Sequence, residues 1–184
     1  MLNLRHKLSE MQKPQEGDFE VLNHGDMWVN NMMFKYDEQN STQPQDVVFV
    51  DFQMSIWGSP GIDLNYFFYT SLPVQLLKEK REHFIEIYYD ELQKSLKLLN
   101  YEKVPSFQQI CDEVRQRALF GFFANHAIYP IISIDKDIAA DSTFENFADR
   151  EFAKKKFKQI LDQQKLKDMY AYTLQHFNEM KVFD

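Results

Sequence analysis

The 184-residue sequence predicts an α+β fold that is mostly α-helical. Two short β-prone runs, MMFKY (32–36) and VVFV (47–50), stand near its beginning, and the polar stretch between them is typical of an exposed hairpin loop. From residue 60 onward, apolar residues recur at helical spacing instead. The expected layout is therefore a small β-hairpin followed by four helices, with too few strands for a sheet of their own.

Before the hairpin, residues 2–12 have the apolar spacing of the end of a short amphipathic helix, which Pro14 and Gly17 end. Val21 and Leu22 indicate a brief strand. After the hairpin, the first of the four helices follows Leu72-Pro73. It is predicted by one apolar stripe at spacings of three and four, formed by Phe84, Tyr88, Leu92, Leu96 and Leu99.

The second helix is expected to begin at Ser106, where Gln109 three places later suggests a capping box. Its segment ALFGFFA is apolar nearly all round, which predicts burial, and Pro130 ends or kinks it. Caps at 141–143 predict a third helix over roughly 143–162. The last helix is expected to run through LKDMYAYTLQHF.

Composition narrows the class of protein. The net charge of −7 without a basic stripe argues against nucleic acid as a partner. A single cysteine excludes an internal disulfide, and Cys111 lies in an apolar helical pattern, as a small buried hydrophobe would. The first residues lack the apolar core of a signal peptide, and no run of 18 apolar residues predicts a membrane span. A soluble cytoplasmic protein is the expectation.

Polar residues with chemical potential gather around the hairpin. His24 and Asp26 precede its first strand, Asn31 begins that strand, and Asp51 follows the second strand immediately. Because a hairpin brings its two ends together, Asp26, Asn31 and Asp51 are expected to converge at one edge. Carboxylate and amide oxygens suit Mg²⁺, which is usually bound with phosphate oxygens and water.

Phosphoryl transfer uses such a set: one carboxylate to orient the acceptor hydroxyl, and a carboxylate and an amide to hold Mg²⁺ on the phosphates of ATP. Protein kinases carry H-R-D-x-x-x-x-N and then D-F-G, whereas this chain has H-G-D-x-x-x-x-N and then D-F-Q. The alternative is a polar loop and a strand-ending Asp without chemistry. The joint pattern favours a kinase-type site.

Two segments, HGDMWVNNMMFKY and VFVDFQMSIWGSPGIDLNYFFYTS, resemble the ecdysteroid kinase-like family of insects and other animals. That family lies within the aminoglycoside phosphotransferase and choline kinase group, which shares the protein kinase-like fold. The resemblance runs from about residue 20 to the C-terminus. It implies an ATP- and Mg²⁺-dependent phosphotransferase whose acceptor is an ecdysteroid or another small alcohol, with no nucleic-acid or membrane partner.

The resemblance also implies roles for single residues. Asp26 matches the catalytic base, Asn31 and Asp51 match the metal- and nucleotide-binding positions, and His24 matches the residue that braces the catalytic loop. Asp63 in GSPGIDLNYF matches a family acid that hydrogen-bonds back to this loop. The residues alone offer a second, compatible role for Asp63 as a helix N-cap.

Trp28 stands two places after the candidate base, where kinases acting on Ser or Thr usually carry Lys, and this favours a small-molecule acceptor. Trp28 and Trp57 either border an apolar acceptor or are buried in the lobe, and burial is favoured for both. Asn30 is expected to face away from the metal site, because alternate residues of a strand point to opposite sides. His126, within the apolar second helix, is expected to be structural.

The five glycines, Gly17, Gly25, Gly58, Gly61 and Gly121, cannot form a G-x-G-x-x-G loop over phosphates. The resemblance therefore implies the C-terminal lobe of a kinase-like fold with its N-terminal lobe absent. Residues 1–20 would be a remnant of a preceding helix and connector. Residues 21–184 would form the lobe, with the catalytic loop at 24–31, the hairpin at 32–50, the metal-binding motif at 51–53 and a helical subdomain at 60–184.

Such a chain by itself is expected to bind Mg·ATP weakly and to transfer phosphate slowly or not at all. The face that would contact the other lobe is expected to be partly apolar and to promote self-association. The alternative function is a non-catalytic truncated module or an inactive fragment of such a kinase.

Overall fold

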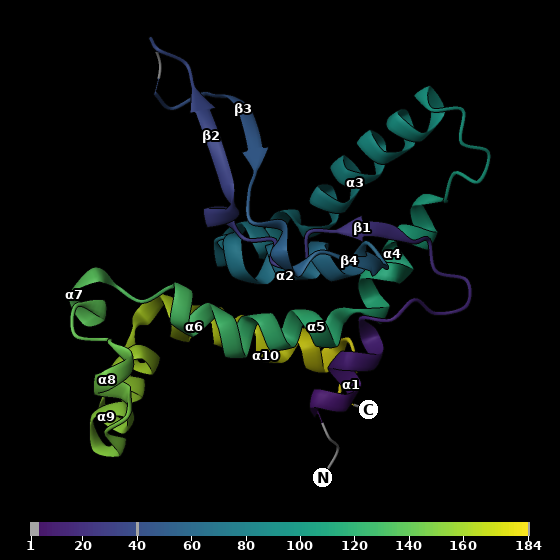
Figure 1. Cartoon of the computed structure of the whole chain (residues 1–184). Coiled ribbons are helices and arrows are strands. Elements are labelled where there is room, and N and C mark those ends of the chain that lie inside the picture. The colour runs from purple at the N-terminus through teal and green to yellow at the C-terminus, as the bar shows by residue number, and fades with distance from the viewer. Residues whose placement is uncertain (1–3, 40, 184) are drawn as a thin grey trace.

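The chain begins with a short helix and two pairs of strands (Figure 1). The computed structural model describes residues 4–39 and 41–183. Strand β1 pairs antiparallel with β4, and β2 pairs antiparallel with β3. The elements of this part are α1 (Leu4–Met11), β1 (Val21–Asn23), the 3₁₀ turn η1 (Val29–Asn31), β2 (Met32–Tyr36), β3 (Pro44–Phe49), the 3₁₀ turn η2 (Phe52–Met54) and β4 (Ile56–Gly58).

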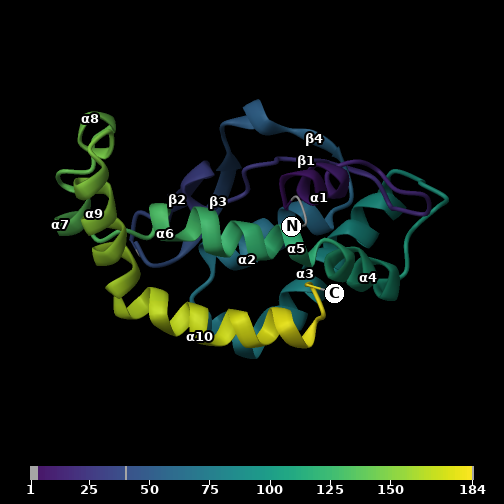
Figure 2. The same cartoon turned by 90° about the horizontal axis from the view of Figure 1, so that it is seen from below.

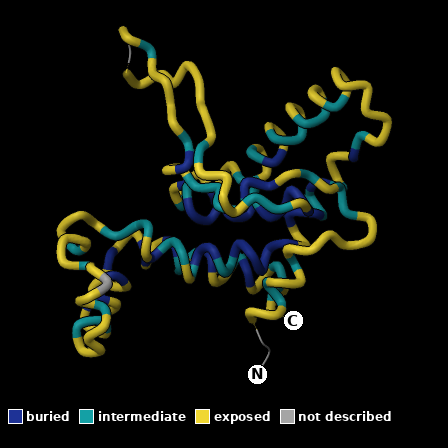
Figure 3. The backbone as a smooth tube through the Cα atoms, in the orientation of Figure 1, coloured by how far each residue is buried: buried dark blue, intermediate teal, exposed yellow. Residues whose placement is uncertain are grey.

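The predicted hairpin is present as β2 and β3, with Met32 opposite Phe49. Strand β3 starts at Pro44, three residues earlier than the apolar run, so the loop is shorter than predicted. The hairpin projects from the body and is exposed on both faces (Figure 3). Met33 and Val48 are cross-strand partners and are 63% and 59% exposed. An isolated two-stranded hairpin gains little stability in water, so its base, where it joins the loop of residues 24–31, is its main support.

The rest of the chain is helical. Its elements are α2 (Gly61–Ser71), α3 (Val74–Leu98), α4 (Phe107–Gln116), α5 (Ala118–Phe123), the π-helical η3 (Ala124–Ile128), α6 (Tyr129–Ile132), α7 (Lys136–Ala139), α8 (Phe144–Phe147), α9 (Arg150–Asp162) and α10 (Gln164–Glu179).

Helix α2 lies at the centre of the molecule. The strands β1 and β4 lie on one side of it, and α5 and α10 run on the other (Figures 1 and 2). Seven of its eleven residues are buried, including Phe68 and Tyr69, which belong to the main apolar core. Because α2 is covered on most sides, it gives a fixed support to the loop of residues 24–31.

The second predicted helix is broken into shorter pieces. Ser106 caps α4 by accepting a hydrogen bond from the Gln109 backbone N–H at 3.1 Å, but the Gln109 side chain reaches Gly17 instead of closing the capping box. The ALFGFFA segment is largely buried, as predicted. Pro130 does not end the helix abruptly: the π-helical turn η3 precedes it, because proline offers no N–H and its ring crowds the turn before it.

Two other helical segments have features that periodicity did not indicate, one in its burial and one in its continuity. The apolar stripe of α3 is only half-buried, and its far end leaves Leu98 and Leu99 each 76% exposed. The single helix expected over 143–162 is divided into α8 and α9. Asp149 caps α9 by accepting hydrogen bonds from the N–H groups of Glu151 and Phe152. A local cap has therefore restarted the helix where periodicity alone predicted continuity.

Two residues expected to be structural pack against the core. The His126 ring stacks between Phe122 and Tyr170, with ring centroids 4.2 and 4.5 Å away, and burial lowers its pKa. Cys111 is half-buried against the main core, so it is less covered than predicted. Within the described residues, no helix combines the length and apolar character needed to span a bilayer.

Candidate active site

The loop that follows β1 is tied together by its own side chains. The Asn31 amide nitrogen donates to the backbone carbonyl of Asp26 at 2.8 Å and to its carboxylate Oδ2 at 3.0 Å. Asn31 is buried, and it closes the 3₁₀ turn η1 instead of beginning the strand as predicted. Because the amide N–H₂ group is used in these contacts, the Asn31 Oδ1 atom keeps its acceptor capacity.

The second carboxylate oxygen of Asp26 has a partner from a different element. The Tyr66 hydroxyl, on α2, donates to Asp26 Oδ1 at 2.7 Å. The sequence reasoning did not identify Tyr66. A signal was present, however, because Tyr66 follows Asp63 by three positions and therefore shares its helix face.

His24 connects this loop to the end of the hairpin. Its Nε2–H donates to the Val50 carbonyl at 2.8 Å, and its Nδ1 accepts from the Asp26 backbone N–H at 3.4 Å. The Val50 N–H in turn donates to the Asn31 carbonyl at 3.0 Å. Both backbone groups of Val50 are thus bound to the loop of residues 24–31, and this brings Asp51, the next residue, beside it.

Asp51 is exposed and has left-handed backbone angles, with φ 67° and ψ 55°. Aspartate tolerates this region better than most residues, but the conformation still carries strain, which is common where a side chain must point in a required direction. The Asp51 carboxylate has one weak contact, 3.5 Å from the Gln53 side-chain nitrogen. Its oxygens therefore remain largely available to a ligand.

Asp63 anchors the loop from below. Its carboxylate accepts hydrogen bonds from the backbone N–H groups of His24 at 2.5 Å and Gly25 at 2.9 Å. Burial raises the pKa of Asp63, although these two hydrogen bonds oppose the shift. The N-cap alternative is wrong, because α2 begins at Gly61 after Pro60 and Asp63 lies in its first turn.

Gly25 has a positive φ of 83°, and a Cβ atom there would lie 2.0 Å from the Met54 carbonyl oxygen. We expect Gly25→Ala to lower the free energy of unfolding by at least about 2 kcal/mol, because it adds backbone strain to a collision with the backbone. Urea denaturation measures this loss. Gly17→Ala is the matched control: φ is 91° there but the space is open, so strain alone should cost about 1 kcal/mol. Equal losses would show that the close approach to Met54 does not matter.

The two tryptophans do not lie alike. Trp28 packs against the small apolar cluster of Ile62, Tyr66, Phe120 and Ala124, and its indole nitrogen is buried without a hydrogen-bond partner in the described structure. Trp57 is 57% exposed on β4, so its predicted burial is wrong. The two-stranded pair β1–β4 has a solvent side, and Trp57 lies there opposite Leu22.

Asn30 is exposed. It lies in the 3₁₀ turn η1 and not in a strand, so the alternation of strand side chains that was used to predict its direction does not apply.

A cavity of about 390 Å³ lies against the loop, between β1 and α3. Met27, the residue after Asp26, is part of its wall, and Asp63 forms part of its floor. The remaining wall is mostly apolar and is formed by Val21, Leu22, Asn23, Met32, Pro60, Leu64, Phe67, Tyr88 and Leu92.

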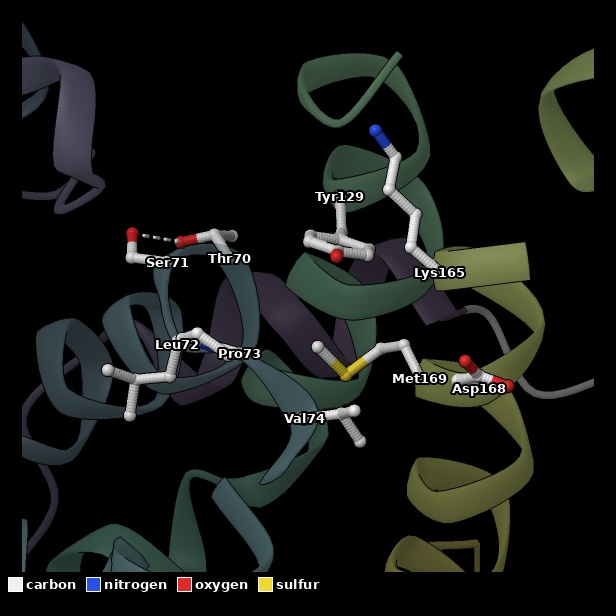
Figure 4. Close-up of a pocket in the computed structure, with 9 residues that line it drawn as sticks. All are labelled: Thr70, Ser71, Leu72, Pro73, Val74, Tyr129, Lys165, Asp168 and Met169. Atoms are coloured by element: carbon white, nitrogen blue, oxygen red, sulfur yellow. Dashed lines mark hydrogen bonds between the residues drawn. The ribbon is translucent and has the colours of Figure 1, made fainter. Parts of the chain in front are cut away.

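A second cavity, of about 380 Å³, lies where the end of α2 meets α6 and α10 (Figure 4). The hydroxyls of Thr70 and Ser71 lie 3.2 Å apart at its edge, and Ser71 Oγ also accepts from the Val29 N–H of the catalytic loop at 2.9 Å. Asp26, Asn31 and Asp51 are not among the described residues that line either cavity, but the first cavity includes Met27 of the loop 24–31, whereas the second includes no residue of that loop. The second cavity therefore borders only the support of the loop.

No group of three or more His, Cys, Asp or Glu side chains that could hold a metal ion occurs among the described residues. The base of the hairpin offers fewer protein ligands than such a group. It offers one carboxylate, from Asp51, and one amide oxygen, from Asn31, beside a carboxylate held by two donors. Two protein oxygens of this type suit a cation that takes its remaining ligands from phosphates and water.

One comparison with known proteins identifies a family. The chain matches the model of the ecdysteroid kinase-like family over residues 1–101. The match begins earlier than residue 20 and ends before α4, so its extent differs from that expected at both ends, yet it contains every residue of the site. No curated protein and no solved structure matches the chain. Because the match covers more than half of the 184 residues, this chain belongs to the ecdysteroid kinase-like family.

Proposed function

We propose that this chain carries the catalytic loop of an ATP-dependent phosphotransferase that acts on a small hydroxylated molecule. Membership of the ecdysteroid kinase-like family supports a kinase-type phosphotransferase. The observation that carries the proposal is the connected cluster at the base of the hairpin. In it, Asn31 bonds to Asp26, and Val50 holds Asp51 beside both.

Asp26 is the base in this proposal. It orients the acceptor hydroxyl and takes its proton as the hydroxyl oxygen attacks the terminal phosphoryl group of ATP. Each carboxylate oxygen has two lone pairs, and the contacts from Tyr66 and Asn31 use one on each oxygen. His24 has a different task, because both of its ring nitrogens are engaged in hydrogen bonds to backbone groups. It braces the loop and does not exchange protons with the substrate.

The residues present fit Mg²⁺. Asn31 Oδ1 and the Asp51 carboxylate are hard oxygen ligands with free acceptor capacity, and together they would hold the ion. When bound, Mg²⁺ would offset negative charge on the phosphates. The left-handed backbone of Asp51 supports this assignment, because it directs the carboxylate to a position that an extended strand residue would not reach.

The acceptor is proposed to bind in the cavity beside Met27. Its volume, about 390 Å³, lies within the range of small-molecule sites, and its largely apolar wall suits the hydrocarbon body of an amphipathic alcohol. Tyr88, in the same wall, supplies a hydroxyl, and burial raises the pKa of Tyr88 to about 12, so it stays a neutral donor. An ecdysteroid is one molecule of this class.

A non-catalytic binding module is the second candidate function. It is favoured by the glycine pattern, because none of the five glycines can form a loop that wraps the phosphates of ATP. Such a module would keep the loop geometry without turning over substrate. The two candidates differ in whether Mg·ATP binds through Asp51.

We expect millimolar Mg·ATP to raise the melting temperature of this chain by about 2–4 °C and to leave Asp51→Asn nearly unshifted. A ligand at fivefold its dissociation constant adds about 1 kcal/mol of stability, which corresponds to such a shift in a chain of this size. Differential scanning fluorimetry measures it.

Asp46→Asn, on the exposed face of the hairpin, is the control and should shift like the unmodified chain. ATP with a chelator should shift neither protein. Equal shifts in the unmodified chain and Asp51→Asn would remove Asp51 from the nucleotide site, and no shift in either would favour the non-catalytic module.

A further inference from the structure

Helix α2 holds the candidate catalytic loop, residues 24–31, at three points along its length. Asp63 binds the N–H groups of His24 and Gly25, Tyr66 binds the Asp26 side chain, and Ser71 binds the Val29 N–H. Asp63, Tyr66 and Thr70 are three and four positions apart and therefore share one side of the helix, whereas Ser71, next to Thr70, leaves the last turn of α2 in a different direction. Thr70 completes this row of three side chains by bonding back to the Tyr66 carbonyl at 2.6 Å.

Tyr66 lies between Asp63 and Thr70 in this row, and its side chain is buried. It is 7% exposed, and its ring packs on Phe120 with ring centroids 6.1 Å apart. Burial raises the pKa of its hydroxyl, and the nearby Asp26 carboxylate raises it further. The hydroxyl therefore remains protonated at neutral pH and can only donate to the ionised carboxylate.

The contact matters because a carboxylate rotates easily. The terminal torsion of Asp is broad, so a hydrogen bond to one oxygen alone does not define the plane of the group. Asn31 holds Oδ2 and Tyr66 holds Oδ1, and the two donors come from different elements. Together they determine in which directions the unused lone pairs of Asp26 point.

We propose that Tyr66 is a positioning residue for the phosphoryl-transfer reaction: its hydroxyl fixes the plane of the Asp26 carboxylate so that a free lone pair faces the acceptor hydroxyl. This inference rests on the proposed function for its catalytic consequence. Its structural part, the orientation of Asp26, does not depend on that function and can be measured separately.

The test compares Tyr66→Phe with Tyr69→Phe. Both tyrosines lie on α2 and are buried, but the Tyr69 ring packs against His176 and Phe177, and the Arg81 side chain interacts with its hydroxyl. Each substitution removes one hydroxyl and keeps the ring, so the packing cost is matched. Only Tyr66→Phe releases Asp26.

The kinetic measurement is phosphate release from Mg·ATP, with water as the acceptor, by the full chain. We expect kcat to fall about tenfold or more in Tyr66→Phe while the KM for ATP changes less than about twofold, because misorientation of the base affects the chemical step. Tyr69→Phe should keep its kcat within about twofold. Equal rates in the two variants would overturn the catalytic role.

The structural measurement needs no activity. NMR spectra of the chain alone report two signals: the side-chain amide of Asn31 and the carboxyl carbon of Asp26, which is identified by its loss in Asp26→Asn. Both signals should move in Tyr66→Phe and stay in place in Tyr69→Phe. If neither moves in Tyr66→Phe, the inference is wrong whatever the kinetics show. If they move but the unmodified chain releases no phosphate, the positioning stands and the proposed function fails.

Discussion

Replacing Asp26 with asparagine is expected to lower the rate of phosphoryl transfer by at least about a hundredfold, because the neutral amide cannot take the proton of the acceptor hydroxyl. Asparagine has nearly the shape of aspartate and can still accept a hydrogen bond from Tyr66. It loses the side-chain contact from Asn31, but Asn31 still donates to the backbone carbonyl of residue 26, so the loop should keep its fold. This separates loss of chemistry from loss of structure.

The measurement follows transfer from radiolabelled ATP to water and to an ecdysteroid over long incubations, since the chain is expected to be slow without a glycine-rich loop. Asp90→Ala, at an exposed position on α3, is the control and should keep the full rate. A rate in Asp26→Asn equal to that of the unmodified chain would remove Asp26 from the reaction. No transfer by the unmodified chain would count against the proposed function.

The second large effect is on stability. Arg117 is fully buried, and its guanidinium forms an ion pair with Asp18, whose side chain is also buried. We expect Arg117→Met to lower the free energy of unfolding by about 3–5 kcal/mol, because Asp18 is then left as a buried charge without its partner. Glu113, one turn earlier on α4 and buried as well, would add a second carboxylate to the same region. Such a loss is a large share of the stability of a typical domain.

Chemical denaturation measures this loss, and Arg115→Met is the matched control. Arg115 precedes Arg117 by two residues, but its ion pair with Asp112 is largely exposed, so its removal should change stability by less than about 1 kcal/mol. Asp18→Asn tests the same pair from its other side. The double variant Arg117→Met with Asp18→Asn should lose less than the sum of the two single losses. Additive losses would show that the two side chains are not coupled.

The kinase-type residues could be identified from the sequence because their relation is short in range. Asp26 and Asn31 are five residues apart, and the hairpin that returns the chain to Asp51 is predicted by two β-prone runs and a polar loop. Strand pairing between Met32 and Phe49 brings these residues to one end, as the pattern required. The roles assigned to them stay predictions until the variants are measured.

The breaks within helices and the exposure of Trp57 could not be predicted in this way. Periodicity indicated continuous apolar helices over the second and third helical segments, but the π-helical turn before Pro130 follows from a missing N–H, and the restart at Asp149 follows from a local cap. Trp57 was expected to be buried because of its residue type. Its exposure depends on which face of the two-stranded β1–β4 pair remains uncovered, and the sequence of β4 does not contain that information.

The sequence by itself determined the chemical groups of this protein: the loop from His24 to Asn31, the hairpin and the aspartate that follows it. Only the tertiary structure decided how Asp26 is held. Tyr66 is 40 residues away along the chain, and its hydroxyl reaches the carboxylate because α2 is fixed between the strands and the buried helix α5. Hydrogen bonds between neighbours follow from local geometry, whereas a contact of this range exists only when the packing of apolar side chains has placed both elements.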